Sequence, residues 1–244
     1  MKTIIAFLLV LFTVSAAYAD NWADEPNRIN KTIDDTNYIV EGHCTGTLID
    51  AKLRLVLTNF HCIDDNVTQK TNPEVWQTRK DNFDILGRNQ YVTNIVAMSK
   101  SKDVAVLQIR DQSLKWVPTP KLAFQVARGE RVYIVGNPAM LEASVVEGII
   151  SNRNRTIGIN GEPHDYLQFS GGIFGGNSGG ALYNRFGQLV AIPSAGLMQA
   201  PFLGFGIPMS VVSEVLEDNC ISVKIDGSVE ESSKCPAQKS KLIK

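Results

Sequence analysis

The sequence predicts an all-β protein, and the pattern of apolar and turn residues supports this prediction. Short runs rich in β-branched residues recur along the chain, and Gly, Pro and Asn residues separate them. Many short strands with turn signals between them are typical of a β-barrel or sandwich rather than of alternating strands and helices. We expect strands within residues 46–49, 53–58, 91–97, 104–109, 131–135, 145–150, 166–169 and 188–192.

Outside these strands, the sequence favours one helix, near the C-terminal end. Ser210 is suited to cap it, and the apolar residues that follow share one helical face: Val211, Val212, Val215 and Leu216. The polar residues 20–37 predict an irregular N-terminal arm, and the Ser-, Lys- and Glu-rich residues 220–244 predict a loosely ordered polar tail. A single folded domain is therefore expected over residues 38–219.

Composition narrows the function classes. The 244 residues include 24 Lys and Arg against 25 Asp and Glu, and 44% of them are hydrophobic. These values are ordinary for a globular protein and exclude wholesale disorder, collagen and coiled coil. Because the charge balance is near zero, the chain lacks the basic surface on which nucleic-acid binding depends, so we expect no nucleic-acid partner.

The first nineteen residues have the pattern of a secretory signal peptide. Lys2 precedes an apolar run over residues 4–14, and Ala17 and Ala19 form an A-x-A cleavage motif before Asp20. The apolar run is well short of the ~20 residues that a membrane-spanning helix needs. We therefore expect a signal peptide over residues 1–19 and a secreted protein, extracellular or periplasmic, that has no membrane association after cleavage.

All four cysteines lie beyond the signal peptide, which suggests disulfides in an oxidising compartment. Of the three possible sets of pairs, we favour the local ones, Cys44 with Cys62 and Cys220 with Cys235. No two cysteines have the short spacing of a zinc site, so no metal is expected. Free buried thiols at Cys220 and Cys235 remain an alternative.

The residues from Gly175 to Gly180 carry the densest chemical signal. Four glycines surround Asn177 and Ser178, so the backbone can bend tightly and bring successive N–H groups towards one point. A serine hydroxyl becomes a useful nucleophile when a base takes its proton and nearby donors stabilise the oxyanion. The N–H groups of Gly176 and Ser178 are suited to the second task. The alternative is a flexible glycine loop with an incidental serine.

The same residues also match the G-x-S-x-G nucleophile elbow of the α/β-hydrolases. In those enzymes the order along the chain is Ser, acid, His. Here all three histidines precede Ser178, and the residues after Ser178 have the pattern of a hairpin rather than of the helix that an elbow needs. We therefore reject this interpretation.

The general base must come from upstream, and His61 is the leading candidate. It ends an apolar strand and stands beside Cys62, so a disulfide there would hold the imidazole on a rigid segment. His43 precedes its strand, and His164 lies in a polar loop.

An acid is also needed to orient the imidazole, and Asp103 leads directly into the apolar strand at 104–109. The alternative is an ordinary turn acid at the start of a strand. Asp64, Asp65 and Asp84 lead no comparable apolar run.

Taken in the order His, Asp, Ser, these motifs resemble those of the trypsin-like (chymotrypsin-fold) serine proteases. Residues 46–49 and 57–62 resemble the strand and histidine motif of that family, with the cysteine pair that brackets it. Residues 103–107 resemble its aspartate motif, and residues 176–180 its serine motif.

Among the branches of the family, the chain is most similar to the bacterial HtrA-like proteases. Residues 134–138, 146–151 and 204–208 resemble segments of that branch, and the whole resemblance spans about residues 38–216. HtrA-like enzymes usually add C-terminal PDZ domains, for which we see no room after residue 219. Digestive trypsins carry an aspartate where this chain has Asn177, so we expect no activation by N-terminal cleavage.

The resemblance implies two six-stranded antiparallel β-barrels of the chymotrypsin type with a C-terminal helix. His61 and Asp103 would come from the first barrel and Ser178 from the second. Ser178 would attack the peptide carbonyl, His61 would accept its proton, and the N–H groups of Gly176 and Ser178 would hold the oxyanion. The partners would be protein or peptide substrates, and no metal or organic cofactor is needed. No oligomeric state is implied.

By the same resemblance, the primary substrate pocket is lined by residues on both sides of the nucleophile: Gly172, Ile173, Ile192, Ser194 and Gly196. None is charged, which favours a small or medium apolar residue at the cleaved position, while Ser194 and His164 keep a preference for Glu open. The alternative function is a catalytically silent secreted binding protein on a protease-like fold. Such proteins usually lack a member of the triad, whereas all three residues are present here.

Overall fold

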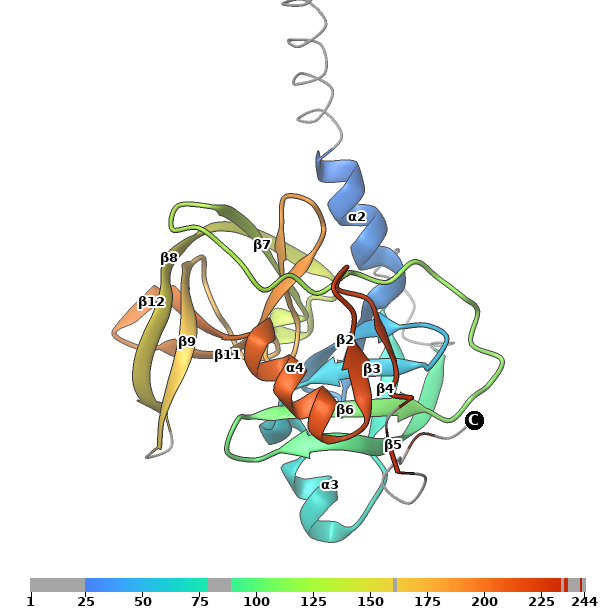
Figure 1. The fold of residues 1–244 in the computed structure, drawn as a ribbon. Helices are drawn as coiled ribbons and strands as arrows, with labels where there is room; N and C mark the ends of the chain where they lie inside the picture. The colour runs from blue at the N-terminus through green and yellow to red at the C-terminus, as the bar shows by residue number, and fades with distance from the viewer. Residues whose placement is uncertain (1–24, 79–88, 160–161, 234, 237–241, 243–244) are drawn as a thin grey trace, which may run out of the picture.

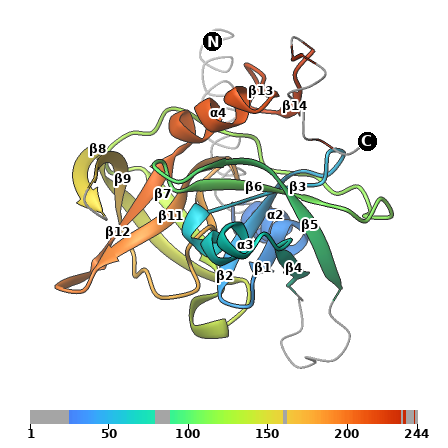
Figure 2. The same cartoon turned by 90° about the horizontal axis from the view of Figure 1, so that it is seen from below.

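In the computed structural model, the described part of the chain comprises residues 25–78, 89–159, 162–233, 235–236 and 242. The predicted signal peptide, residues 1–19, lies outside it, as does the alternative acid Asp84. Two closed antiparallel barrels stand side by side, one built from the first half of the chain and one from the second (Figures 1 and 2). The predicted all-β fold with two six-stranded barrels and a C-terminal helix is confirmed.

The first barrel contains the segments that carry His61 and Asp103. Its strands follow the order β1-β2-β3-β6-β5-β4. Their bounds are β1 Asn37–Val40, β2 Cys44–Asp50, β3 Leu55–Thr58, β4 Glu74–Gln77, β5 Gln90–Ser99 and β6 Val104–Ile109, with the short helices η1 Phe60–Cys62 and α3 Asp64–Gln69 between β3 and β4.

The second barrel contains the nucleophile segment, in the connection between β9 and β10. Its strands follow the order β10-β11-β12-β9-β8-β7. Their bounds are β7 Arg131–Gly136, β8 Ser144–Ile159, β9 Glu162–Ser170, β10 Ala181–Asn184, β11 Leu189–Leu197 and β12 Ala200–Pro208, with the short helix η2 Pro138–Met140 after β7. The predicted strand at 104–109 has the observed bounds of β6, whereas β1, β4, β10 and β12 were not among the predicted strands.

A shared hydrophobic core joins the two barrels. It combines residues of the first barrel, such as Leu57, with residues of the second, such as Tyr183. The C-terminal helix α4 (Met209–Asp218) contacts strands of both barrels and buries Met209, Val212, Val215 and Leu216 (Figure 1). Pro208 precedes this helix without a side-chain cap and Ser210 is exposed, so the predicted capping by Ser210 is wrong.

The arm predicted to be irregular contains a helix, α2 (Glu25–Thr36). Ile29 and Ile33, four residues apart, lie on one face of this helix and are 2% and 3% exposed within the shared core. At the start of the helix, the buried Glu25 carboxylate accepts a 2.7 Å hydrogen bond from the hydroxyl of Tyr133 in β7. Burial of the two isoleucines therefore fixes a segment whose mainly polar sequence suggested no order.

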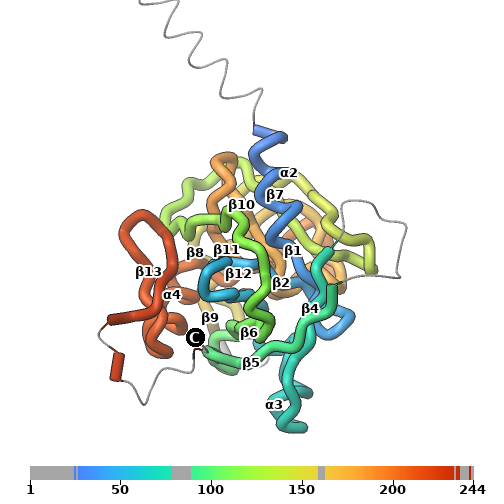
Figure 3. The backbone as a smooth tube through the Cα atoms, turned by 90° about the vertical axis from the view of Figure 1, so that its right-hand side faces the viewer, coloured from blue at the N-terminus to red at the C-terminus, as the bar shows by residue number. Residues whose placement is uncertain are grey.

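The tail predicted to be loosely ordered begins with a short hairpin of β13 (Ile221–Val223) and β14 (Val229–Glu231). Figure 3 shows β13 beside α4 on one side of the molecule. The hairpin contacts the connection between the barrels, where Lys121 Nζ lies 2.7 Å from Asp226 Oδ2. The Lys121 ammonium holds the pKa of Asp226 below its usual range, and hydrogen bonds from Ser228 add to the decrease.

Candidate active site

His61 and Asp103 are brought together by the pairing of β3 with β6. Thr58, at the end of β3, lies opposite Ala105 in β6. Because the strands are antiparallel, the turn that follows β3 and the turn that precedes β6 meet at the same edge of the barrel. His61 lies in η1, in the first of these turns, and Asp103 ends the second.

The carboxylate of Asp103 holds the imidazole ring in one orientation. His61 Nδ1 lies 2.9 Å from Oδ2 and 3.0 Å from Oδ1, and the backbone N–H of His61 donates to Oδ1 at 3.0 Å. A proton on Nδ1 satisfies this contact and leaves Nε2 free to accept a proton. Asp103 has a φ of +52°, a sparsely populated conformation of the kind that concentrates at functional sites. Asn59 Nδ2 donates a 3.0 Å hydrogen bond to the backbone carbonyl oxygen of Asp103.

The second barrel also contacts Asp103. Ser194 Oγ, in β11, donates to Asp103 Oδ2 at 2.7 Å. Tyr166 in β9 lies near the same two groups: burial raises the pKa of its phenol, the charge of Asp103 adds to the increase, and a hydrogen bond with Ser194 opposes it. Tyr166 was not among the predicted site residues, and Ser194 was predicted only as a pocket residue.

The glycines of the nucleophile loop, residues 175–180, allow close approach to neighbouring backbone. Gly176 has a φ of +104° and Gly179 a φ of +76°. A Cβ atom at Gly176 would clash with the carbonyl oxygen of Asn137, and one at Gly179 with the carbonyl oxygen of Thr45. In the described residues, neither the N–H of Gly176 nor that of Ser178 donates to a protein acceptor, so both remain available to a ligand.

Ser178 lies next to the segment that carries His61. Its carbonyl oxygen accepts a 2.8 Å hydrogen bond from the N–H of Thr45 and lies 3.9 Å from Sγ of Cys62. Within the described ranges, the His61 ring hydrogen-bonds only to Asp103. Contacts between a base and its nucleophile often tighten only when substrate binds.

A comparison with protein-family models identifies the family of this chain. The model of the trypsin-like peptidase domain matches residues 44–192, a segment that contains all three predicted catalytic residues. The chain belongs to the trypsin-like peptidase family. The resemblance to this family predicted from the sequence is therefore confirmed.

Relatives of this chain include HtrA- and Do-type proteins. The putative protease Do-like 14 of Arabidopsis thaliana is 31% identical over 180 residues, which cover 71% of this chain and 40% of that protein. Serine endoprotease DegS of Haemophilus influenzae is 30% identical over 191 residues, covering 76% of this chain and 52% of that protein. The chain thus spans about half, or less, of the length of these curated relatives.

Solved structures show the same fold. The crystal structure of Deg5 has a TM-score of 0.64 at 21% identity, and the match covers 79% of this chain and 92% of that one. The HtrA-type protease AlgWS227A with tripeptide has a TM-score of 0.64 at 22% identity, covering 80% of this chain and 62% of that one.

Both predicted cysteine pairs form disulfides in the structure. Cys44 is bonded to Cys62, with Cα atoms 5.9 Å apart, and Cys220 to Cys235, with Cα atoms 5.4 Å apart. Donor atoms of Cys44, His61 and Cys62 lie within 4.8 Å of one another. Because the two sulfurs are bonded to each other, they are not thiolates, and this set does not fit a zinc site.

Three of the residues predicted to line the substrate pocket, Gly172, Ile173 and Gly196, can be placed by their neighbours, which include Gly204. A Cβ atom at Gly196 would lie 3.5 Å from Cβ of Ile173, and one at Gly204 would lie 2.7 Å from Cδ1 of Ile173, so these positions adjoin. A Cβ atom at Gly172 would meet the ring of the exposed Phe174.

Two of the predicted pocket residues make other contacts in the structure. Ile192 is 0% exposed and packs in the core shared by the barrels. The hydroxyl of Ser194 is engaged with Asp103. His164, which kept a preference for Glu open, lines a different cavity of about 500 Å³ with Lys102 and Tyr166.

The alternative base, His43, and the alternative acids Asp64 and Asp65 lie outside the contact between His61 and Asp103. His43 Nδ1 lies 2.8 Å from the carbonyl oxygen of Glu41. Asp64 Oδ2 lies 3.5 Å from Lys100 Nζ, and Asp65 lies in the first turn of α3. None of them replaces His61 or Asp103 in the contact described above.

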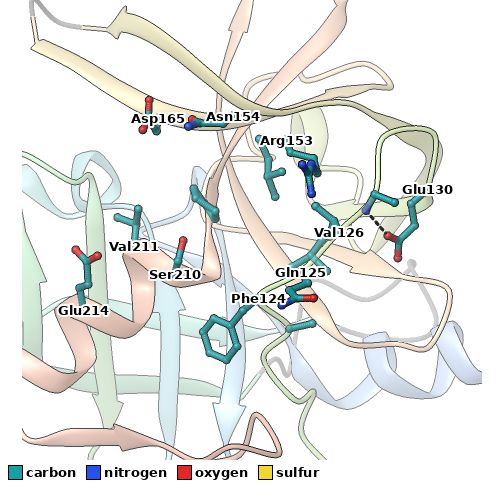
Figure 4. A pocket seen from close by; sticks show the side chains of 15 residues that line it. Phe124, Gln125, Val126, Glu130, Arg153, Asn154, Asp165, Ser210, Val211 and Glu214 are labelled. Atoms are coloured by element: carbon teal, nitrogen blue, oxygen red, sulfur yellow. Dashed lines mark hydrogen bonds between the residues drawn. The ribbon is translucent and has the colours of Figure 1, made fainter.

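A larger cavity, of about 930 Å³, lies away from these residues. Figure 4 shows it between the β8–β9 ribbon, the connection between the barrels and α4, with Arg153, Phe124 and Ser210 among the side chains around it. Its lining residues do not include His61, Asp103 or Ser178, so this cavity is not the candidate active site.

Proposed function

We propose that the protein is a secreted serine endopeptidase that acts through His61, Asp103 and Ser178. The observation that carries this proposal is the contact of His61 Nδ1 with both carboxylate oxygens of Asp103, at 2.9 and 3.0 Å, at the edge of the barrel that faces the nucleophile loop. Membership of the trypsin-like peptidase family supports it.

In the proposed reaction, Ser178 Oγ attacks the carbonyl carbon of the peptide bond and His61 Nε2 accepts the hydroxyl proton. Asp103 stabilises the imidazolium that results. When the tetrahedral intermediate collapses, the C–N bond breaks and His61 returns the proton to the leaving amine. Water, deprotonated by the same imidazole, then hydrolyses the ester on Ser178.

The oxyanion would be bound by the N–H groups of Gly176 and Ser178. Both donors are free of protein acceptors in the described part of the chain. The loss of one such donor typically lowers kcat by about 10²–10³-fold. The positive φ of Gly176 explains why the loop has a glycine at this position.

For the substrate, we propose proteins or peptides with a small or medium apolar residue at the cleaved position. The relatives are named proteases, and AlgWS227A was solved with a tripeptide. In this chain the Ile173 side chain adjoins Gly196 and Gly204, where it occupies space that a long side chain of the substrate would need.

Secretion is part of the proposal. Two disulfides favour an oxidising compartment, and residues 1–19 have the signal-peptide pattern. Among the helices of the described residues, none is long and apolar enough to cross a membrane.

A fluorophosphonate serine probe tests the function directly. We expect the probe to label the purified mature protein, and labelling to disappear in Ser178→Ala and His61→Ala and to remain in Ser213→Ala, which removes an exposed hydroxyl on α4. Peptide cleavage should fall by about 10⁴-fold or more in the first two variants. A folded, disulfide-intact wild type that neither labels nor cleaves would instead indicate a silent binding protein.

A further inference from the structure

Four successive carbonyl groups of the nucleophile loop, those of residues 175–178, each accept a hydrogen bond. Gly175 O accepts from the N–H of Ala139 at 2.9 Å, and Asn177 O from the N–H of Gly180 at 3.0 Å. Between and after these, Gly176 O accepts from Thr45 Oγ1 at 2.6 Å and Ser178 O from the N–H of Thr45 at 2.8 Å. Two of these four contacts therefore come from a single residue of the other barrel.

Each anchored carbonyl fixes the direction of the N–H that follows it. In a trans peptide the C=O and N–H bonds point in opposite directions, and the described residues contain no cis peptide. The contacts of Gly175 O and Asn177 O therefore aim the N–H groups of Gly176 and Ser178 away from those anchors. The contacts of Thr45 direct the two alternate N–H groups, of Asn177 and Gly179, to Phe174 O and Pro193 O, both at 3.0 Å.

The hydroxyl of Thr45 has only one orientation available. Its oxygen accepts hydrogen bonds from both N and Nδ2 of Asn137, each at 3.0 Å. With both acceptor positions filled, its single proton must go to Gly176 O. Thr45 is 0% exposed, so water does not compete for these contacts. This hydroxyl thus links the first barrel, the residue after β7 and the nucleophile loop.

We propose that Thr45 is a positioning residue for the oxyanion site, and that its hydroxyl holds the Gly176–Asn177 peptide so that the N–H groups of Gly176 and Ser178 act together. This inference rests on the proposed function, since those two groups bind the oxyanion there. The backbone contact from Thr45 to Ser178 is open to any residue except proline. The side chain contributes only the contacts of Oγ1, so a valine isolates them.

The experiment compares four proteins by steady-state cleavage of one peptide. Thr45→Val should lower kcat by about 10²-fold and leave KM within about threefold, because the oxyanion forms only in the transition state. Thr45→Ser keeps the hydroxyl and should stay within about threefold of wild type in kcat. The matched control is Thr93→Val, which removes an equally buried hydroxyl that donates to Pro73 O at 2.7 Å in the same barrel. Its kcat should not change.

Two results would overturn the proposal: a folded Thr45→Val with wild-type kcat, or a Thr45→Ser as impaired as Thr45→Val, which would indicate packing alone. If Thr45→Val does not fold, Thr45→Ala decides by the same criteria. A readout independent of activity is amide hydrogen exchange at Asn177, whose N–H belongs to the peptide held by Thr45 Oγ1 and donates to Phe174 O. This exchange should accelerate about tenfold in Thr45→Val and not in Thr93→Val. An inactive wild type with this exchange difference would reject the proposed function and retain the role of Thr45 in ordering the loop, whereas unchanged exchange would overturn that role too.

Discussion

Ser194 Oγ donates a 2.7 Å hydrogen bond to Oδ2 of Asp103, and this contact joins β11 of the second barrel to the acid that orients His61. With the side chain shortened in Ser194→Ala, Oδ2 loses a donor and the carboxylate is held less firmly against Nδ1. We expect kcat to fall by about 10–100-fold, since a neutral donor to a charged group contributes roughly 1.5–3 kcal/mol. Peptide cleavage kinetics measure this, with Ser213→Ala as the control, and an unchanged kcat would show that the contact does not serve catalysis.

The strained glycine of the nucleophile loop gives a second prediction. Gly176→Ala should lower kcat by about 10²–10³-fold, because Cβ would displace the loop from the carbonyl oxygen of Asn137 and misplace the oxyanion donors. Gly158→Ala is the matched control, since a Cβ atom there meets nothing within 4 Å. Equal cleavage rates for the two variants would contradict a role for the Gly176 conformation.

We expect the two disulfides to contribute similarly to the free energy of unfolding and differently to catalysis. They close loops of similar length, with sequence separations of 18 and 15, so removing either should cost about 3 kcal/mol of unfolding free energy. Cys44 and Cys62 adjoin Thr45 and His61, so only their double alanine variant should also lower kcat when assayed while folded. Denaturant unfolding and peptide cleavage measure the two effects, and the Cys220, Cys235 double variant is the comparison. Loss of kcat in both variants would refute the distinction.

The N-terminal helix should contribute to global stability. Ile33→Ala empties a site that is 3% exposed in the core shared by the barrels, and we expect a loss of about 2–4 kcal/mol in the free energy of unfolding. Lys31→Ala, an exposed neighbour in α2, should change it by less than ~0.5 kcal/mol. Urea denaturation provides the measurement, and equal stabilities would mean that α2 does not stabilise the barrels.

Specificity gives the last prediction. Because Ile173 adjoins Gly196 and Gly204, Ile173→Ala should enlarge the proposed pocket. We expect kcat/KM to shift by about tenfold or more towards substrates with a larger apolar residue at the cleaved position, as each added methylene in such a pocket is worth roughly 1–3 kcal/mol. A peptide library measures this, and an unchanged profile would place the pocket elsewhere.

The sequence was informative where a function depends on local pattern. Short apolar runs separated by turn residues predicted an all-β fold. The glycines around Ser178 and the strand ends at His61 and Asp103 indicated the candidate triad. Such patterns can be recognised in the sequence because each depends on a few adjacent residues.

What the sequence did not reveal depends on contacts between distant segments. Ser194 was assigned to the pocket because nothing in its neighbours indicates a partner 91 residues away, and Thr45 is an inconspicuous residue of a β-strand. The helix over 25–36 was missed because two isoleucines in a polar segment are a weak pattern until a core is available to bury them.

The contacts of Thr45 also bear on the stage of folding at which this chain would acquire its proposed reactivity. The hydroxyl of Thr45 reaches a carbonyl 131 residues further along the chain, so the contact exists only after both barrels have formed and docked. Before that step, a chain with a finished first barrel would contain His61 and Asp103 in place but no ordered nucleophile. Newly made molecules would therefore stay inert towards one another while still partly unfolded and easily cleaved.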